Sequence, residues 1–199
     1  MDPNQAPLGV RHLMSLNRVM VRQKGGIFEG NKYVLVGPDD KAFMYVKEDA
    51  STFAVVFGGK DRAFHMDLFD AEHKNVITLR RPYTFGPDKL EVRICGQLAS
   101  IVRQEPTFFK PVLNINDAQD RNIFRVKGSV QTGGECDFRI FTRDKKQVGV
   151  IRKLWGGFMR EAFSHNDNFQ LEFPLDLDVR IKAGIIGTCF LIDFLYYEK

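Results

Sequence analysis

The sequence contains little that supports covalent catalysis. Its three cysteines, Cys95, Cys136 and Cys189, are scattered and show neither a disulfide framework nor zinc-ligand spacing. The four histidines lie far apart, and none forms a nucleophile–base pattern with a cysteine or serine. The glycine pairs also lack the spacing of a phosphate-binding loop. These absences argue against an enzyme and favour binding or transport in a reducing compartment.

A secretory signal and a strong excess of one charge are also lacking. The N-terminus, Met1-Asp2-Pro3-Asn4, has no basic segment followed by an apolar one, and it lacks the glycine that myristoylation requires. The net charge is +4 and the sequence pI is about 9.0, which suits anionic lipid but makes nucleic acid an unlikely partner. We therefore expect an unsecreted protein on the cytoplasmic face of the plasma membrane or of another membrane, or in the cytosol or nucleus.

Long apolar runs are absent except for one short stretch without charge, residues 183–192. As a helix it would span roughly 15 Å, about half of a bilayer core. Lys182 and Asp193 bracket it, and extending the span to full length would immerse both of them together with Arg180, which is costly. We expect a buried core helix, with a membrane span as the alternative. Its main apolar residues are Ile185, Ile186, Cys189, Phe190, Leu191 and Ile192.

Most of the remaining chain alternates between apolar and polar residues over short segments that are joined by turn residues. The 18 phenylalanines favour strands. Residues 33–36 and 43–46 flank Gly37-Pro38-Asp39-Asp40, a strong hairpin signal. A short helix near residue 13 and a strand at 19–23 are expected before this hairpin. The segments expected to form strands after it are 64–69, 76–79, 90–94, 98–102, 112–115, 122–126, 136–141, 148–151 and 169–173.

Two of these hairpins look related. Residues 64–83 align without gaps on residues 136–155, an offset of 72 (136 minus 64). The simplest interpretation is two similar sheet halves in one domain. About eleven or twelve antiparallel strands could close into a barrel, which removes exposed edges and encloses the C-terminal helix. The predicted fold class is mainly β, with residues 1–10 as a flexible arm and residues 11–199 as a single domain.

The same alignment matches two basic pairs, Arg80-Arg81 and Arg152-Lys153. These pairs could face anionic lipid, or they could be solvated strand ends. With Arg143, Lys145 and Lys146 they could form one positive surface, worth about 1 kcal/mol per charge near an anionic membrane.

A polar segment, residues 165–176, precedes the apolar stretch and offers carboxylate and carboxamide oxygens, which suit Ca²⁺. Counted against an EF-hand loop, His165 takes position 1, Asp167 position 3, Phe169 position 5 and Asp176 position 12, which is a poor match. The alternative is a strand over residues 169–173 with capping residues around it. If calcium binds, its affinity should be weak because few charged ligands converge.

Three runs near the C-terminus closely resemble the phospholipid scramblases, and a weaker likeness extends over nearly the whole chain from about Leu8. The resemblance implies a tubby-like fold, a barrel around a hydrophobic C-terminal helix. It also implies Ca²⁺-activated, ATP-independent movement of phospholipids between leaflets. The runs are Arg160-Glu161-Ala162-Phe163, Phe173-Pro174-Leu175-Asp176-Leu177-Asp178-Val179 and Cys189-Phe190-Leu191-Ile192-Asp193-Phe194.

The resemblance also assigns a calcium segment, in which this chain departs from the family pattern. Only Asp167 and Asp176 bring carboxylates, and His165 replaces an acidic residue of better-known members. The palmitoylated, cysteine-dense stretch of the family corresponds to residues 83–90, which contain no cysteine here. Looser membrane attachment is therefore expected. The candidate ligand positions are His165, Asp167, Phe169, Leu171, Phe173 and Asp176.

Two functions remain open from the sequence. The first is a phospholipid scramblase-like protein whose partner is an anionic phospholipid membrane. The second is a soluble tubby-like module that binds anionic lipid or protein in a signalling or transcription-linked role. Protein partners are compatible with both, and the oligomeric state is open.

Overall fold

The computed structural model describes residues 2, 4–23, 33–48, 63–83, 85–107, 110–128, 136–154 and 168–197. Twelve antiparallel strands form a closed barrel in the order β1-β12-β11-β10-β9-β8-β7-β6-β5-β4-β3-β2. Strand β1 closes the sheet because it pairs with β12 on one side and with β2 on the other. The predicted closed antiparallel barrel is confirmed.

The strands occupy almost the places that the alternating pattern predicts. Their bounds are β1 Arg18–Gln23, β2 Tyr33–Val36, β3 Ala42–Glu48, β4 Phe64–Asp70, β5 Asn75–Arg81, β6 Lys89–Ile94, β7 Gln97–Gln104, β8 Val112–Asp117, β9 Asn122–Gly128, β10 Cys136–Phe141, β11 Gln147–Leu154 and β12 Asn168–Glu172.

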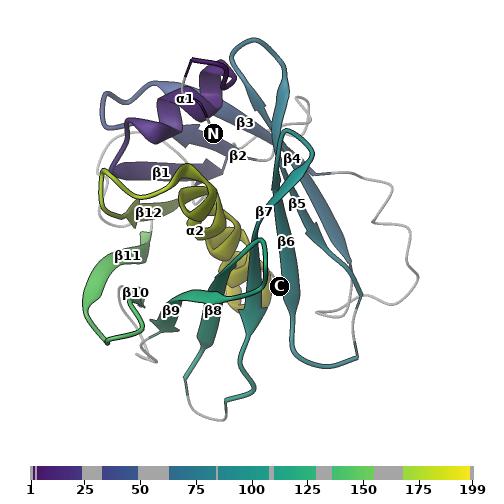
Figure 1. Cartoon of the computed structure of the whole chain (residues 1–199), viewed down its shortest axis with the longest axis vertical. Helices are drawn as coiled ribbons and strands as arrows, with labels where there is room; N and C mark the ends of the chain where they lie inside the picture. Colours follow the sequence, from purple (N-terminus) through teal and green to yellow (C-terminus); the bar gives the residue numbers. More distant parts are fainter. Residues whose placement is uncertain are drawn as a thin grey trace.

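Three helical elements complete the fold: α1 (Leu8–Met14), α2 (Val179–Ile192) and the π-helical turn η2 (Asp193–Tyr197). Helix α2 runs inside the ring of strands, and α1 lies over the end of the barrel at which α2 begins (Figure 1). We refer to this end as the α1 end and to the opposite one as the η2 end. Every residue of α2 except Arg180 is buried, which confirms the predicted core helix. Among the described helices, none has both the length and the apolar character needed to cross a membrane.

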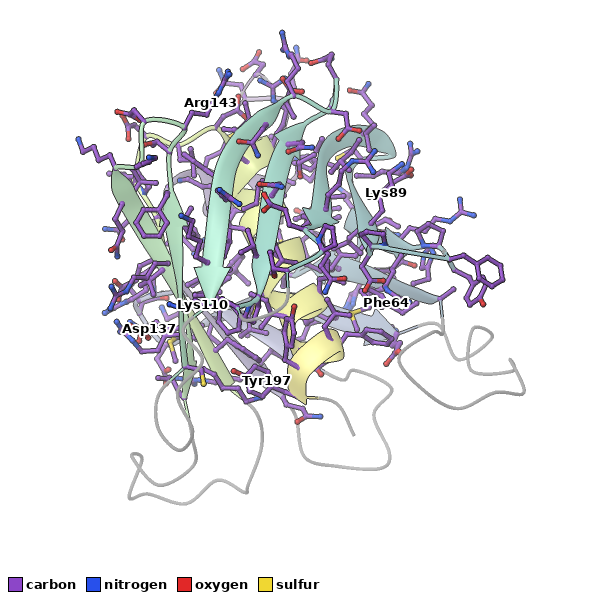
Figure 2. The ribbon with its side chains drawn as sticks, turned by 90° about the horizontal axis from the view of Figure 1, so that it is seen from below. Phe64, Lys89, Lys110, Asp137, Arg143 and Tyr197 are labelled. Carbon is purple, nitrogen blue, oxygen red and sulfur yellow. The ribbon has the colours of Figure 1, made fainter. Side chains whose placement is uncertain are left out.

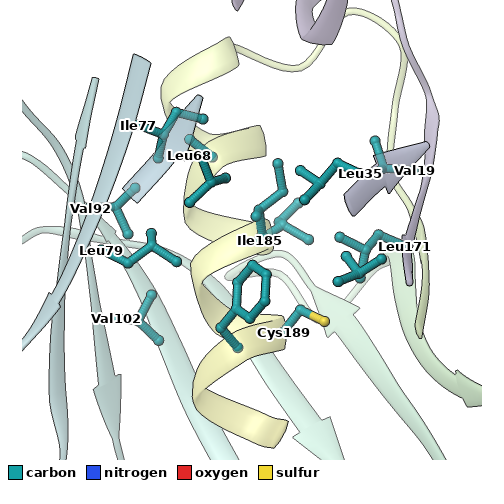
Figure 3. Close-up of a cluster of buried hydrophobic side chains, with 14 of the residues drawn as sticks. Val19, Leu35, Leu68, Ile77, Leu79, Val92, Val102, Leu171, Ile185 and Cys189 are labelled. Atoms are coloured by element: carbon teal, nitrogen blue, oxygen red, sulfur yellow. The ribbon is translucent and has the colours of Figure 1, made fainter. Parts of the chain in front are cut away.

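Inward-facing apolar residues of the strands surround α2. Because successive side chains of a strand point to opposite faces, each strand contributes every second residue to this core. Ile185 and Cys189 of α2 lie between two groups of strand side chains (Figure 3). The groups are Val19, Leu35 and Leu171 on one side and Leu68, Ile77, Leu79, Val92 and Val102 on the other.

Two glycines allow α2 to approach the strands closely. A Cβ atom at Gly184 would lie 2.7 Å from the Ser100 Oγ atom, and one at Gly187 would lie 2.7 Å from a Val92 methyl group. Any larger residue would therefore push the helix away from β6 and β7 or displace strand side chains. The Gly184 and Gly187 positions place the helix axis nearer to this side of the barrel.

The two hairpins that align in the sequence are also similar in structure. Hairpins β4–β5 and β10–β11 both shift register at equivalent residues, Phe69 and Phe141. Both turn through a residue with positive φ, His73 at 59° and Lys145 at 66°. Strands β4 and β10 are six places apart in the ring of twelve, so the related hairpins stand on opposite sides of the barrel. This is the arrangement expected of two similar halves.

Helix α1 is fixed at both of its ends by buried charged groups. The Gly9 N–H donates to the Asp70 carboxylate at 3.4 Å, and the Lys182 ammonium donates to the Leu13, Met14 and Leu16 carbonyl oxygens at 3.3, 2.8 and 2.6 Å. A carboxylate at the N-terminus and a cation at the C-terminus both match the helix dipole. Helix α1 begins at Leu8, within the range of the predicted arm, residues 1–10.

The start of α2 offers a test of helix capping by Asp178. Its carboxylate accepts a hydrogen bond from the Arg180 N–H at 2.8 Å, and bonding to the Arg180 guanidinium lowers the pKa of Asp178 below its ordinary value of 3.8. A carboxyl group with a lowered pKa stabilises the fold above its unfolded-state pKa, and this stabilisation is lost as the pH falls through the folded-state value. Asp178→Ala should lower the free energy of unfolding by about 1 kcal/mol near neutral pH.

Urea unfolding followed by circular dichroism at several pH values measures this effect. The difference between Asp178→Ala and the wild type should begin to shrink as the pH falls below about 4, and should disappear only below the folded-state pKa of Asp178, which is lowered from 3.8. Asp176→Ala, which removes an exposed carboxylate two residues earlier, is the control and should change the stability by less than about 0.5 kcal/mol. Equal losses in the two variants, or a difference that persists in acid, would contradict the capping role.

Candidate functional site

The residues predicted for the core or membrane helix all face protein. Ile185, Ile186, Cys189, Phe190, Leu191 and Ile192 are each at most 1% exposed. Burial raises the pKa of the Cys189 thiol well above its ordinary value, and the nearby Asp193 carboxylate raises it further. Because the thiolate is the reactive form of cysteine, Cys189 is an inert core residue.

A buried charged cluster lies where α2 ends. The Lys153 ammonium is 3.4 Å from the Asp193 carboxylate, which also accepts a hydrogen bond from the Tyr33 hydroxyl at 2.8 Å. Lys153 is 1% exposed and Asp193 is 3% exposed. The ammonium also stands over the Phe169 and Tyr197 rings, 4.6 and 4.0 Å from their centroids. The cluster thus connects β2, β11 and β12 with the first residue of η2.

A second buried ion pair closes the same end of the barrel. The Arg81 guanidinium donates through Nε to the Asp88 carboxylate at 2.7 Å. It also lies 4.7 Å from the centroid of the Phe194 ring in η2. Arg81 and Lys153 are equivalent in the internal repeat, and each binds a carboxylate inside the barrel. Both halves of the repeat therefore place a buried cation at the η2 end.

The predicted lipid-facing basic residues divide between the two faces of the sheet. Arg80 is exposed, and Arg152 is partly exposed and lies 2.9 Å from the Asp137 carboxylate. Arg81 and Lys153 point inward and are buried, so their prediction as lipid-facing residues is wrong. The physical reason is the period of a strand, which sends neighbouring residues to opposite faces. The same period is present in the sequence, where each basic pair follows a run of alternating residues.

The remaining predicted basic residues, which are exposed or lie in a turn, also do not form one positive surface. Arg143, Lys145 and Lys146 belong to the β10–β11 turn at the α1 end, whereas Arg80 and Arg152 lie toward the η2 end. Arg143 stands at the opposite end of the barrel from Tyr197 and from Asp137, the partner of Arg152 (Figure 2). The predicted single surface is therefore replaced by two separate groups of charge.

The predicted calcium segment is only partly within the described residues. His165 and Asp167 lie outside them. Phe169, Leu171 and Phe173 point into the core and are 1%, 0% and 5% exposed, and Asp176 is exposed in the turn before α2. Across the described ranges, no group of three His, Cys, Asp or Glu side chains gathers closely enough to hold a metal. Strand β12 keeps this part of the segment extended, so it does not fit a single calcium-binding loop.

These features define a class of protein: a closed antiparallel barrel built around its own C-terminal helix, with charged pairs buried where that helix ends. The chain belongs to the Scramblase family, whose sequence model matches residues 2–199. The resemblance to phospholipid scramblases in the sequence is therefore confirmed.

Three relatives illustrate the similarity. The chain is 29% identical to Phospholipid scramblase 1 of Mus musculus, over 99% of this chain and 66% of that protein. It is 30% identical to Phospholipid scramblase 1 of Homo sapiens, over 99% of this chain and 68% of that protein. It is 29% identical to Phospholipid scramblase family member 5 of Homo sapiens, over 96% of this chain and 78% of that protein. The chain thus spans about two thirds of the length of the first two relatives. No solved structure matches the chain significantly.

Proposed function

We propose that the protein moves phospholipids between the leaflets of a membrane without ATP, from a position on a cytoplasmic membrane face. The observation that carries this proposal is the family match over residues 2–199, together with relatives that are named phospholipid scramblases. Lipid movement makes and breaks no covalent bond, so the protein acts as a transporter and not as an enzyme.

The filled barrel limits how such transport would work. Helix α2 occupies the interior with apolar side chains, which would not accommodate a charged headgroup. Lipid movement would therefore use the outer surface of the barrel or the bilayer beside it. One outer surface suits a zwitterionic headgroup, because a shallow cleft of about 420 Å³ on the β8–β9 hairpin, bordered by Glu105 just after β7, combines carboxylates, carboxamides and a guanidinium. It is lined by Glu105, Asn114, Asn116, Asp120, Asn122 and Arg125.

Calcium activation is a separable part of the proposal. Among the candidate ligand positions, the carboxylates are Asp167 and Asp176, of which Asp176 is exposed. Phe169, Leu171 and Phe173 face the core, so any further ligands from β12 would be the partly exposed Gln170 and Glu172, whose side chains bond each other.

The experiment is dithionite bleaching of a fluorescent phospholipid in liposomes that carry the purified chain, without ATP. Transport predicts more bleaching than in protein-free liposomes, and calcium activation predicts a further rise that a chelator reverses. Asp176→Asn should shift the calcium response, whereas Asp144→Asn, in the β10–β11 turn, should not. Bleaching equal to that of empty liposomes would reject the transport function. Bleaching that ignores calcium would reject only the calcium part.

A second candidate function is a soluble tubby-like module that binds anionic lipid or protein in a signalling or transcription-linked role. The burial of α2 favours it, because the most apolar segment of the chain contacts protein and not lipid. It predicts detergent-free solubility and salt-sensitive flotation with anionic liposomes, without lipid movement. Extraction from membranes by detergent alone would argue against it.

A further inference from the structure

The β5–β6 connection presents two aromatic side chains to solvent. Phe85 is 95% exposed and Tyr83 is 52% exposed, and their rings contact edge to face with centroids 5.0 Å apart. Among the described large apolar residues, Phe85 is the most exposed. Single exposed apolar residues are ordinary, but a contacting aromatic pair on one connection is typical of a contact surface.

The base of this connection is held rigidly. The buried Arg81–Asp88 ion pair joins its two ends, and Arg81 packs on Phe194 of η2. The Asp88 carbonyl oxygen accepts a hydrogen bond from the Gln104 N–H at 2.8 Å, which fixes the connection to β7. Pro82 and Pro87 further restrict the backbone between the ends of the pair. A contact made through Tyr83 and Phe85 would therefore lose little conformational entropy.

Positive charge accompanies the aromatic pair. On the outer face of the β5–β6 hairpin, Glu91 receives the ammonium of Lys89 at 3.0 Å and the guanidinium of Arg93 at 3.3 Å. Arg80 stands opposite the same glutamate in the strand register. Three cations and one carboxylate therefore lie on the outer face of the hairpin, which keeps a net positive charge.

We propose that Tyr83 and Phe85 insert into the boundary between headgroups and acyl chains of an anionic phospholipid membrane, with Arg80, Lys89 and Arg93 toward the headgroups. Aromatic side chains favour this boundary, and cations beside it are attracted to anionic lipid. The combination of an aromatic tip with a cationic hairpin matches such a surface better than it matches an apolar protein face. The choice of lipid as the partner rests on the proposed function, and the inference adds which surface of the barrel docks.

The test is flotation with vesicles of phosphatidylcholine that contain about 30% phosphatidylserine at low salt, because anionic lipid and salt control the electrostatic part of binding. Tyr83→Ser with Phe85→Ser should weaken binding about tenfold or more, since it removes two apolar side chains from the lipid contact. Leu175→Ser is the matched control, because Leu175 is 58% exposed at the α1 end, and this variant should bind like the wild type. Circular dichroism melts confirm that both variants fold.

A second variant reports insertion directly. Phe85→Trp should keep vesicle binding, and its added emission over the background of Trp155 should be quenched by lipids with brominated acyl chains. Unchanged binding of the double serine variant, or no quenching in F85W, would overturn the proposal. The proposal would also be overturned if the wild type did not bind vesicles but self-associated, and if the serine substitutions abolished that self-association.

The proposed function can fail separately. A wild type that floats with vesicles but moves no labelled lipid would reject transport and leave the docking surface standing. A double serine variant that binds and transports like the wild type would reject the docking surface and leave transport standing.

Discussion

Replacing Asp193 with alanine is expected to lower the free energy of unfolding by about 3–5 kcal/mol. The Asp193 carboxylate is buried, lies 3.4 Å from the Lys153 ammonium and accepts the Tyr33 hydroxyl hydrogen bond. The variant breaks the ion pair between Asp193 and the buried Lys153 ammonium, and removing one partner of a buried ion pair is strongly destabilising. Urea unfolding followed by circular dichroism measures the loss.

The double variant Lys153→Met with Asp193→Leu separates the ion pair from the packing. It removes both charges, so it should recover much of the stability that Asp193→Ala loses, because apolar replacement of a whole buried pair is often close to neutral. Tyr33→Phe removes one hydrogen bond and should lower the stability by about 1 kcal/mol. Additive losses for the two charge deletions would show that Lys153 and Asp193 are not coupled, contrary to the structure.

Replacing Lys182 with methionine is expected to lower the free energy of unfolding by about 2–3 kcal/mol and to release α1 from the barrel. The three N–H groups of the ammonium are shared among four carbonyl oxygens, three at the end of α1 and one at Leu175, the last at 2.8 Å. Loss of the ammonium leaves buried carbonyl oxygens without this donor. Burial also lowers the pKa of Lys182 below 10.5, so holding the charged form inside the fold is unfavourable. Methionine removes that penalty, which offsets part of the loss.

Hydrogen exchange of the amides in residues 8–14 distinguishes local release from global unfolding. In Lys182→Met these amides should exchange faster than those of β7, which pack against the other side of α2. Arg180→Met is the matched control, because Arg180 is the exposed cation of the same helix and should leave α1 exchange unchanged. Protection of α1 that is equal in Lys182→Met and the wild type would contradict a role for this ammonium in holding the helix.

Much of the barrel follows from local patterns in the sequence. Alternation and turn residues locate the hairpins, as at Gly37-Pro38-Asp39-Asp40 between β2 and β3. The uncharged stretch of residues 183–192, too short for a bilayer and bracketed by charges, indicates a helix enclosed by protein. The internal repeat relates β4–β5 to β10–β11 because both hairpins keep the same bulge and the same positive-φ turn position.

The candidate site is less predictable because its members come from distant parts of the chain. In the sequence, Lys153 stands beside Arg152 and resembles a surface cation. Its burial follows only from the strand period together with the position of Asp193. The calcium segment contains oxygen-bearing side chains that suit a metal-binding loop and also the alternation of a strand. Pairing of β12 with both β1 and β11 decides in favour of the strand for Phe169 and Leu171.

The elements, their order and the need to bury the C-terminal helix follow from the amino-acid sequence, because hydrophobic period and turn chemistry are local properties. Which charges are buried and which face solvent depends instead on how the chain closes in three dimensions. The reason is that the partners of a buried charge are set by barrel closure, which brings Tyr33 and Lys153 to Asp193 from 160 and 40 residues away. The same closure places Lys182 beneath α1 and leaves Tyr83 and Phe85 exposed outside the barrel.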